Sequence, residues 1–600
     1  MIEKRINIIF FSLSAISFLI LIIRNFYVPM AHDEIGTFFT YIQIGEFLPY
    51  KSYIDANNHI LNSFLSWISY KLFGASPFAL RLPNLIFFPV LVFSTYKLLA
   101  YFNTFSAKIL LTSVLLFSFN WLSFYSLCRG YGISMSLLVL SLYFFISYFQ
   151  SGFQLKHFLG FVVVIQFAIS ANLTLQIITI LLTSLLLLYH LISLKINNWK
   201  IVSIYVFNFL SLKFWVDYSF YLKQNGALYY GTGESYWKVT FDTLIGLIIG
   251  HENFWVNLVV TFLFALVLLM ALYYQTRSIT SIKSQLQKPN PFLLISLTAF
   301  ALILGFYAMK ILLGINYPED RAALFFYPIF MIITVYLVDY LKIEKVAISI
   351  SLIFVIHFLL SINFEKHTML EYESLPDKFY TTLKKEQEKT ENKITIGNHR
   401  QTKQFFLAYA NYLDNGNLNY SDVQDEINPY CDYYLGALDE EKKLNKNYLK
   451  IAFDKNWGFG LFKRRNEIKK TKIYELNEKI NVNNEQEFYD MIKWKDTLLP
   501  NIENSVLLFE FEFDVKNASK PFSGIFILDI KSKNEKNSCY KSFTMNHQKF
   551  DWNNTKSNKY SILSPVLKNE ISQFSFYFWN KRKQEIEMSI TKFAIYRLNQ

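Results

Sequence analysis

Long apolar runs constrain this chain more than any other feature of its sequence. A helix that crosses a membrane needs about 20 mostly apolar residues. The sequence predicts eleven such helices, at residues 6–28, 80–100, 108–125, 131–150, 158–171, 173–193, 200–218, 253–275, 292–315, 322–341 and 346–363. Only the short sequence Ser-Ala-Asn at 170–172 interrupts the fifth and sixth runs, which are the weakest. The chain is therefore expected to be a polytopic helical membrane protein.

Charged residues divide the chain into two parts. Residues 1–363 hold only 22 of the 59 lysines and arginines and 13 of the 46 acids. The rest has a water-like composition, so a main domain boundary is expected near Phe364. The three cysteines show no CxxC spacing, so the sequence predicts neither a disulfide framework nor a thiolate metal site.

Basic residues between the runs indicate the orientation. With the N-terminus in the cytoplasm, most lysines and arginines between the spans fall in short inner loops, as the positive-inside rule requires. The net charge of +13 is then no sign of nucleic-acid binding. The first run is long and lacks a small-residue cleavage site, which predicts a retained anchor. An odd span number places residues 364–600 outside the cytoplasm, and the bias toward Asn, Lys, Ile and Phe suggests a bacterial inner membrane.

The longest loop between spans, residues 29–79, opens with His32, Asp33 and Glu34. In the same orientation ten of the 13 acids in the membrane part lie at the outer face, and Asp33 and Glu34 are among these ten. Residues 60–72 carry apolar side chains at helical spacing, which predicts an amphipathic helix in the membrane interface. Such a helix would cover a cavity at the outer leaflet.

Several charged residues lie within or beside the apolar runs, and three cations among them are singled out: Arg129, Lys310 and Arg321. An ionisable group at membrane depth costs several kcal/mol unless it is paired or hydrated, so each is a functional candidate. Snorkelling of a long side chain explains Lys310 equally well. Arginine suits phosphate because its planar guanidinium offers paired donors.

The order of these motifs resembles that of the GT-C glycosyltransferases. The acidic pair after the first span is followed by an interfacial helix, by ALRLPNLIFF at 79–88, by Arg-Gly-Tyr at 129–131 and by PEDRAALFFYPI at 318–329. The set is most similar to the branch of protein mannosyltransferases and lipid A aminoarabinose transferases (glycosyltransferase family 39-like). The match covers residues 1–363. It departs from the family at Asn172, where many members carry a histidine.

This resemblance implies transfer of a sugar from a polyprenyl-phosphate donor to a hydroxyl of a lipid, glycan or protein on the extracytoplasmic side. It implies inversion, with Asp33 as the base that takes the hydroxyl proton and Glu34 as its partner or an acceptor contact. An apolar groove would hold the prenyl chain. The donor phosphate would be bound by Arg129, Arg321, Lys310 and Tyr131.

Four further polar residues are candidates for the acceptor side or its loops: Asp55, His59, His251 and Glu252. An ordinary interfacial connector also explains the last two. No cofactor is required, but a divalent ion stays open, with candidate ligands His32, Glu34 and His59. No HxxxH pair supports it.

Beyond the membrane part the sequence predicts two further domains. Residues 364–468 read as a charged linker followed by a small α/β unit, and residues 469–600 alternate with period two, which favours a β-sandwich. A sandwich in this setting suggests a carbohydrate-binding module, although a packing domain is equally compatible. Trp494, Trp552 and Trp579 would stack on sugars or fill its core.

Other functions were weighed against glycosyl transfer. A flippase or transporter of lipid-linked sugars would show duplicated halves and charges deep in several spans, and neither is present in the sequence. An O-antigen ligase or polymerase would place its main loop late in the chain, without acids after the first span. A receptor would not need so many spans.

Overall fold

The structure is a computed structural model of the whole chain. It describes residues 2–599 apart from 194–195, 197, 229–233, 278–288, 368–374, 376, 391–392, 400–402, 417, 420–422, 425–426, 456, 477, 496–504, 519–520, 533–537, 548–557 and 568–570. The chain forms two compact units. Unit 1 comprises residues 1–28 and 45–369, and unit 2 comprises residues 29–44 and 370–600.

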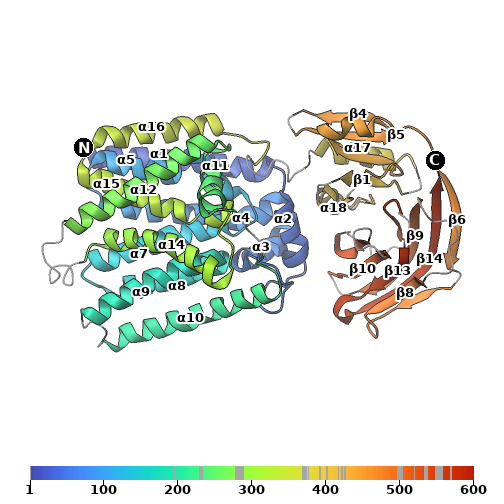
Figure 1. Cartoon of the computed structure of the whole chain (residues 1–600), viewed down its shortest axis with the longest axis horizontal. Coiled ribbons are helices and arrows are strands. Elements are labelled where there is room, and N and C mark those ends of the chain that lie inside the picture. Colours follow the sequence, from blue (N-terminus) through green and yellow to red (C-terminus); the bar gives the residue numbers. More distant parts are fainter. Residues whose placement is uncertain are drawn as a thin grey trace. The chain divides into compact units, whose positions relative to one another are not determined.

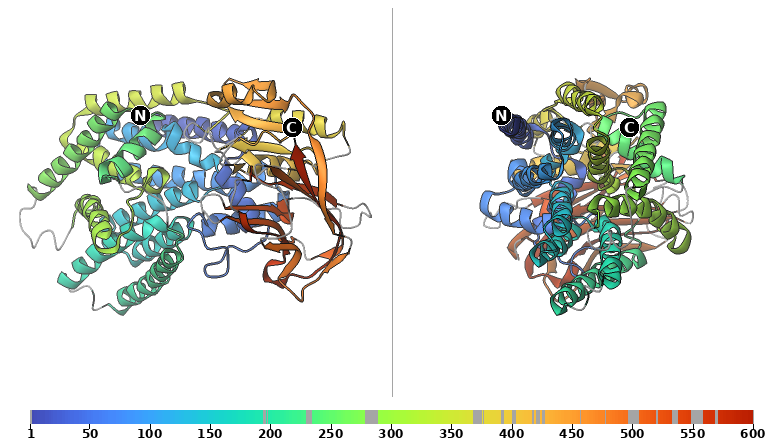
Figure 2. Two further views of the ribbon diagram at one scale, coloured as in Figure 1. Left: turned by 45° about the vertical axis from the view of Figure 1, so that its right-hand side comes forward. Right: turned by 90° about the vertical axis from the view of Figure 1, so that its left-hand side faces the viewer.

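Unit 1 is built from helices, and Figures 1 and 2 show its long helices lying side by side. Between them lie the shorter helices α3 (Ile60–Phe73), α6 (Phe119–Ser123) and α11 (Thr243–Ile249). The long helices are α1 (Ile2–Tyr27), α4 (Pro77–Leu98), α5 (Phe105–Leu116), α7 (Tyr131–Gln150), α8 (Leu155–Ala171), α9 (Gln176–Ile192), α10 (Trp199–Gln224), α12 (Phe254–Arg277), α14 (Pro291–Leu313), α15 (Phe326–Leu341) and α16 (Glu344–Ser361).

The polytopic helical fold predicted from the sequence is confirmed, and a helix lies in each of the eleven apolar runs. The number of full spans is smaller than predicted. Among the described residues eight helices are long and apolar enough to cross a membrane, or nine if the bent pair α5–α6 is one span. Helices α8 and α15 are apolar but shorter than that length.

Local breaks explain the difference. Helix α5 ends at Leu116, and the chain turns by 46° before α6. Helices α8 and α9 separate at Asn172, whose Oδ1 accepts hydrogen bonds from the backbone N (3.2 Å) and Oγ1 (2.8 Å) of Thr174. An asparagine that caps a new helical turn in this way ends the preceding helix.

Helix α3 confirms the predicted helix after the first span, but its polar face is the buried one. Ser66 and Ser69 donate to the backbone oxygens of Leu80 (2.9 Å) and Ala79 (2.5 Å) on α4. Leu72 and Phe73 are exposed. Small hydroxyl residues let two helices approach closely and hydrogen-bond, while apolar side chains face outward, as suits a helix beside lipid.

Unit 2 begins with residues 29–44, which carry α2 (His32–Thr37) and the π-helix η1 (Phe38–Ile42). Its α/β part has helices α17 (Asp377–Gln387), α18 (Lys403–Leu413) and α19 (Glu441–Leu444). The five-stranded sheet has the order β2 (Val423–Gln424), β1 (Ile396–His399), β3 (Tyr433–Ala437), β5 (Phe459–Arg464) and β4 (Tyr448–Asp454), with β1 parallel to both neighbours.

The remaining strands form the predicted β-sandwich. One sheet has the order β11 (Cys539–Thr544), β10 (Ile525–Ser532), β13 (Ile571–Trp579) and β8 (Phe488–Lys495). The other has the order β12 (Asn558–Leu563), β9 (Val506–Ala518), β14 (Ile586–Asn599) and β6 (Lys469–Leu476), with β7 (Ile480–Val482) also on β14. Phenylalanines from both sheets, such as Phe511 and Phe576, fill the core between them.

Candidate functional site

Arg129 lies at the turn that leads into α7, and its side chain is buried. It is only 3% exposed. Its guanidinium donates to Oδ1 (2.7 Å) and to the backbone oxygen (3.2 Å) of Asn57. These bonds join the Arg-Gly-Tyr element to the first loop, two segments that are far apart in the sequence.

His59 and Tyr131 lie beside this arginine. The Nδ1 atom of His59 is 2.6 Å from the backbone oxygen of Ala171, and its ring meets that of Tyr131 with centroids 4.7 Å apart. Gly130 fits between them, because a Cβ atom there would lie 2.1 Å from the Ala171 oxygen and 2.8 Å from His59 Nδ1. We call Asn57, His59, Arg129 and Tyr131 the Arg129 cluster.

Two further residues border the Arg129 cluster. Asp55 accepts a hydrogen bond from the backbone N–H of Asn57 (2.8 Å), which fixes the loop that presents Asn57 to Arg129. Asn172, which stands where the GT-C resemblance leads one to expect a histidine, is 5% exposed. Its Nδ2 has no hydrogen-bond partner within the described part of the chain. His59 thus brings an imidazole to the turn that lacks the expected one.

Lys310 and Arg321 lie around the connection from α14 to α15. Lys310 is in the last turn of α14, donates to Asn316 Oδ1 (2.8 Å) and lies over the ring of Tyr317 (5.8 Å). Arg321 is partly exposed and lies in the 3-10 turn η7 (Asp320–Ala323). Asp320 has φ of 50°, and its backbone N–H donates to Thr243 Oγ1 (2.8 Å). The hydrogen bond to Thr243 therefore fixes the turn formed by the PEDR sequence, and α15 starts after this turn.

His251 and Glu252 are both exposed in the connector after α11. The buried acid nearby in the sequence is Asp242, which accepts hydrogen bonds from Lys238 Nζ (2.6 Å) and Asn257 Nδ2 (2.7 Å). The structure gives His251 and Glu252 no place in the Arg129 cluster.

Asp33 and Glu34 open α2 and belong to unit 2. Glu34 is fully buried, and its Oε2 accepts the backbone N–H of Ala31 (2.8 Å), so this carboxylate caps the helix. Asp33 keeps 14% of its side chain exposed, and its Oδ1 lies 3.6 Å from Nδ1 of His32. The His32 ring packs edge-on against Phe405 of α18, with centroids 4.8 Å apart. Of the pair, Asp33 is the one with solvent access.

The predicted site residues thus fall into separate groups. Arg129, Tyr131, His59 and Asp55 come together in unit 1, and Asp33, Glu34 and His32 are neighbours in unit 2. Among the described residues no group of three or more His, Cys, Asp or Glu side chains is placed to hold a metal ion. The three candidate ligands His32, Glu34 and His59 therefore form no metal-binding group there.

Two fully buried arginines were missed by the sequence reasoning: Arg24 in α1 and Arg81 in α4. Arg24 donates to the backbone oxygens of Asn363 and Lys366, and it lies 3.4 Å from Nδ1 of His367. Arg81 donates to the backbone oxygen of Val28 (2.7 Å). Burial, followed by the charges of the two arginines, holds the pKa of His367 well below its usual value. The position of each arginine inside an apolar run is the sequence signal that could have identified both residues.

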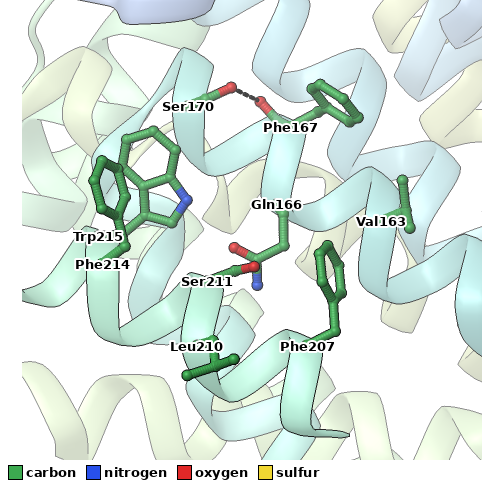
Figure 3. A pocket seen from close by; sticks show the side chains of 9 residues that line it. All are labelled: Val163, Gln166, Phe167, Ser170, Phe207, Leu210, Ser211, Phe214 and Trp215. Carbon is green, nitrogen blue, oxygen red and sulfur yellow. Dashed lines mark hydrogen bonds between the residues drawn. The ribbon is translucent and has the colours of Figure 1, made fainter. Parts of the chain in front are cut away.

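An apolar groove of about 500 Å³ lies between α8 and α10 (Figure 3). Its polar groups are few: Gln166 donates to Asn208 Oδ1 (3.0 Å), and Ser170 donates to the backbone oxygen of Phe167 (2.7 Å). Ser170 of the groove precedes Ala171 in the chain, and the backbone oxygen of Ala171 lies 2.6 Å from His59 Nδ1. Trp215 of the groove, like Leu173, packs against a hydrophobic cluster that contains Ile60. Its apolar lining includes Phe167, Phe207, Leu210, Phe214 and Trp215.

Comparisons with known proteins give likenesses in structure only. No family model and no curated protein matches the sequence. The chain is similar to ArnT from Cupriavidus metallidurans bound to undecaprenyl phosphate, with 11% identity, a TM-score of 0.46, and coverage of 76% of this chain and 97% of that one.

Two more solved structures are similar over 98% of this chain. Arabinosyltransferase EmbB from Mycobacterium smegmatis has 9% identity and a TM-score of 0.38, with 64% of its own chain covered. An oligosaccharyltransferase from Archaeoglobus fulgidus, tethered to an acceptor peptide with the NVT sequon, has 10% identity and a TM-score of 0.35, with 97% covered. All three are glycosyltransferases of the GT-C fold, to which the sequence motifs are similar.

Proposed function

We propose that this chain is a membrane glycosyltransferase that moves a sugar from a polyprenyl-phosphate donor to an acceptor hydroxyl. The observation that carries the proposal is the Arg129 cluster, in which a buried guanidinium, a histidine and a tyrosine come together in the same polytopic helical unit as an apolar groove. A lipid phosphate needs a cation for its head and apolar walls for its tail.

Each step of the reaction is assigned to a side chain. The acceptor O–H gives its proton to the carboxylate of Asp33, and its oxygen attacks the anomeric carbon. The bond from that carbon to the phosphate oxygen breaks, and its electron pair stays on the lipid phosphate. Attack opposite the leaving group inverts the anomeric centre. Arg129, Tyr131, Lys310 and Arg321 stabilise the charge on that phosphate.

The carboxylates of the pair have different roles. Glu34 is committed to the backbone of Ala31, so it fixes α2 and thereby the position of Asp33. Asp33 retains exposed surface and a neighbouring imidazole. A base at a membrane surface must be reachable by a hydroxyl while partly shielded from water, and the 14% exposure of the Asp33 side chain supports this role.

The membrane part supplies the setting for these steps. We propose that the protein lies in a bacterial inner membrane with its N-terminus in the cytoplasm. With nine spans, in which α5 and α6 count as one, or with eleven, the α/β part and the sandwich would then lie outside. The distribution of lysine and arginine between the apolar helices supports this orientation.

Donor binding by Arg129 tests the proposal. The purified chain in lipid nanodiscs is titrated with a panel of polyprenyl-phosphate sugars, and Kd and transfer are measured. Replacement Arg129→Ala should weaken donor binding by about tenfold to a hundredfold, the scale of one lost charge-assisted contact. The matched control is Lys213→Ala, which removes an exposed cation of α10 paired with Asp217. Equal donor affinity in Arg129→Ala, or no transfer from any donor by the unaltered chain, would contradict the proposal.

A further inference from the structure

The outer face of one sandwich sheet carries a row of aromatic side chains that the proposed reaction does not use. On β10 and β13 every second residue, such as Leu528 and Phe576, points into the core. The residues between them point outward. Four rings lie on that outward face: Phe488 on β8, Tyr577 and Trp579 on β13, and Tyr540 on β11. We call these four side chains the aromatic row.

Strand pairing places the aromatic row across the whole sheet. Trp579 pairs with Phe488, and their rings stack with centroids 5.8 Å apart and an interplanar angle of 14°. Phe488 also meets Tyr577 at 5.9 Å. Tyr577 and Tyr540 lie on either side of β10, where they pair with Ile527 and Asp529. Three strand spacings of about 4.8 Å make the row about 14 Å long.

The row is accessible. Phe488 is 52% exposed and Tyr540 is 59% exposed, while Tyr577 and Trp579 are partly exposed. Folding alone gives no reason to place large rings outside a sheet whose core already holds many phenylalanines. Exposed aromatic side chains gathered on one face mark a binding surface.

Carboxylates flank the rings. Asp490 pairs with Tyr577 and Asp529 pairs with Tyr540 on neighbouring strands. Burial, Tyr577 and then Asp529 raise the pKa of Tyr540 to about 12, so its hydroxyl stays neutral and can donate. Lys493 and Lys531 follow toward one end of the same face, and Lys581 Nζ lies 5.5 Å from the Trp579 ring. The face therefore combines rings with hydrogen-bonding groups of both signs.

We propose that the aromatic row is a binding site for a linear, uncharged glycan chain. Sugar rings have apolar C–H faces that pack on aromatic rings, and hydroxyls that donate to carboxylates and accept from tyrosine or lysine. The balance of charge decides the class of partner. An acidic glycan or an anionic lipid surface would be repelled by Asp490 and Asp529, which pair with Tyr577 and Tyr540. A cationic partner would be repelled by the lysines of the same face, whereas an uncharged polyol meets neither repulsion.

The test is glycan binding by the full-length chain in nanodiscs. The probes are neutral oligosaccharides of glucose, mannose, xylose and arabinose, with an anionic uronic-acid oligosaccharide and anionic vesicles for comparison. We expect at least one neutral oligosaccharide to bind, and the variant with both Phe488→Ala and Tyr540→Ala to bind it at least tenfold more weakly. Leu449→Ala, an equally exposed apolar change on β4, should bind as the unaltered chain does.

The other possible results of this experiment either support or overturn the proposed glycan site. Tyr540→Phe removes one hydroxyl without removing a ring, so a smaller loss there supports the proposal independently of folding. Binding of no neutral glycan, a preference for the anionic probes, or equal binding by the double variant would overturn it. Asp33→Asn should bind glycan normally, so loss of transfer and loss of glycan binding are separate results.

Discussion

At the scale of single residues, hydrogen bonds and ring contacts hold the side chains of the Arg129 cluster in place. Arg129 donates hydrogen bonds to the side-chain amide oxygen and the backbone oxygen of one residue, Asn57. A guanidinium has five N–H donors and keeps its positive charge in such a setting, so it can still attract an anion. His59 and Tyr131 flank it. The hydrogen-bond donors of Arg129 are therefore expected to matter for anion binding more than its positive charge alone.

Gly130 offers the sharpest test at this scale. Gly130→Ala should destabilise unit 1 by about 1–3 kcal/mol, because the new methyl group would overlap the Ala171 oxygen and force the turn to move. Thermal unfolding in detergent measures the change. Gly305→Ala is the matched control, since nothing lies within 4 Å of a Cβ at that position in α14. Equal melting temperatures for the two variants would show that the turn is not tightly packed.

At the scale of secondary-structure elements, the periodicity of apolar residues predicted many of the helices and strands. The apolar runs became helices, and stretches such as residues 505–516 and 571–582 became strands β9 and β13. The inward polar face of α3 was not predictable, because periodicity shows which face is apolar but not which face the protein covers. The contact of Arg129 with Asn57 joins residues 72 positions apart, and no local pattern encodes it.

The groove between α8 and α10 makes a prediction for the lipid tail. Leu210→Trp should raise the KM for a long-chain donor about tenfold by displacing a few buried CH₂ groups, each worth about 0.8 kcal/mol. A donor with two isoprene units should be unaffected. Val206→Trp, also on the exposed side of α10 but outside the groove, is the control. An equal rise in KM for both donors would place the tail elsewhere.

Helix α17 is tied to the α/β sheet by Glu386, which gives a pH-dependent prediction. Its carboxylate accepts from Lys463 Nζ (2.8 Å) and from the hydroxyl of Tyr433 (2.5 Å), and it is ion-paired with Lys389. Bonds from Lys389, then Lys463 and Tyr433, lower the pKa of Glu386 from 4.5 to about 2. A depressed pKa adds stability above 4.5 that is lost as the pH falls through about 2.

Glu386→Gln should therefore lower the melting temperature at pH 7 by about 2 °C, the modest scale of a partly exposed ion pair. The difference should shrink as the pH falls below 4.5. Glu478→Gln changes an exposed acid on the loop after β6 and serves as the control. A difference that persists unchanged at the lowest pH would mean that charge is not what Glu386 contributes.

At the scale of the whole molecule, the chain is divided differently from a simple cut near Phe364. Residues 29–44 leave the helices of unit 1 and pack within unit 2. Gln43 Nε2 donates to the backbone oxygen of Asn546, and Asn546 Nδ2 donates to Gln43 Oε1, both at 2.8 Å. The ring of Phe39 lies 4.2 Å from that of His547. Burial lowers the pKa of His547 to about 3. Composition could not predict this, because it reports local polarity and not long-range pairing.

The proposed base, Asp33, and the proposed phosphate ligands, such as Arg129, act at different stages of the reaction. Loss of the base should leave donor binding intact and slow only the chemical step, whereas loss of a phosphate ligand should weaken the donor complex itself.

Single-turnover transfer from pre-bound donor by Asp33→Asn tests the central claim most directly. The account predicts that the variant binds the polyprenyl-phosphate sugar as tightly as the unaltered chain and transfers it at least about a hundredfold more slowly, the scale of a lost general base. Glu478→Gln, an exposed acid on the loop after β6, should transfer at the normal rate. Transfer by Asp33→Asn at the rate of the unaltered chain would contradict the account.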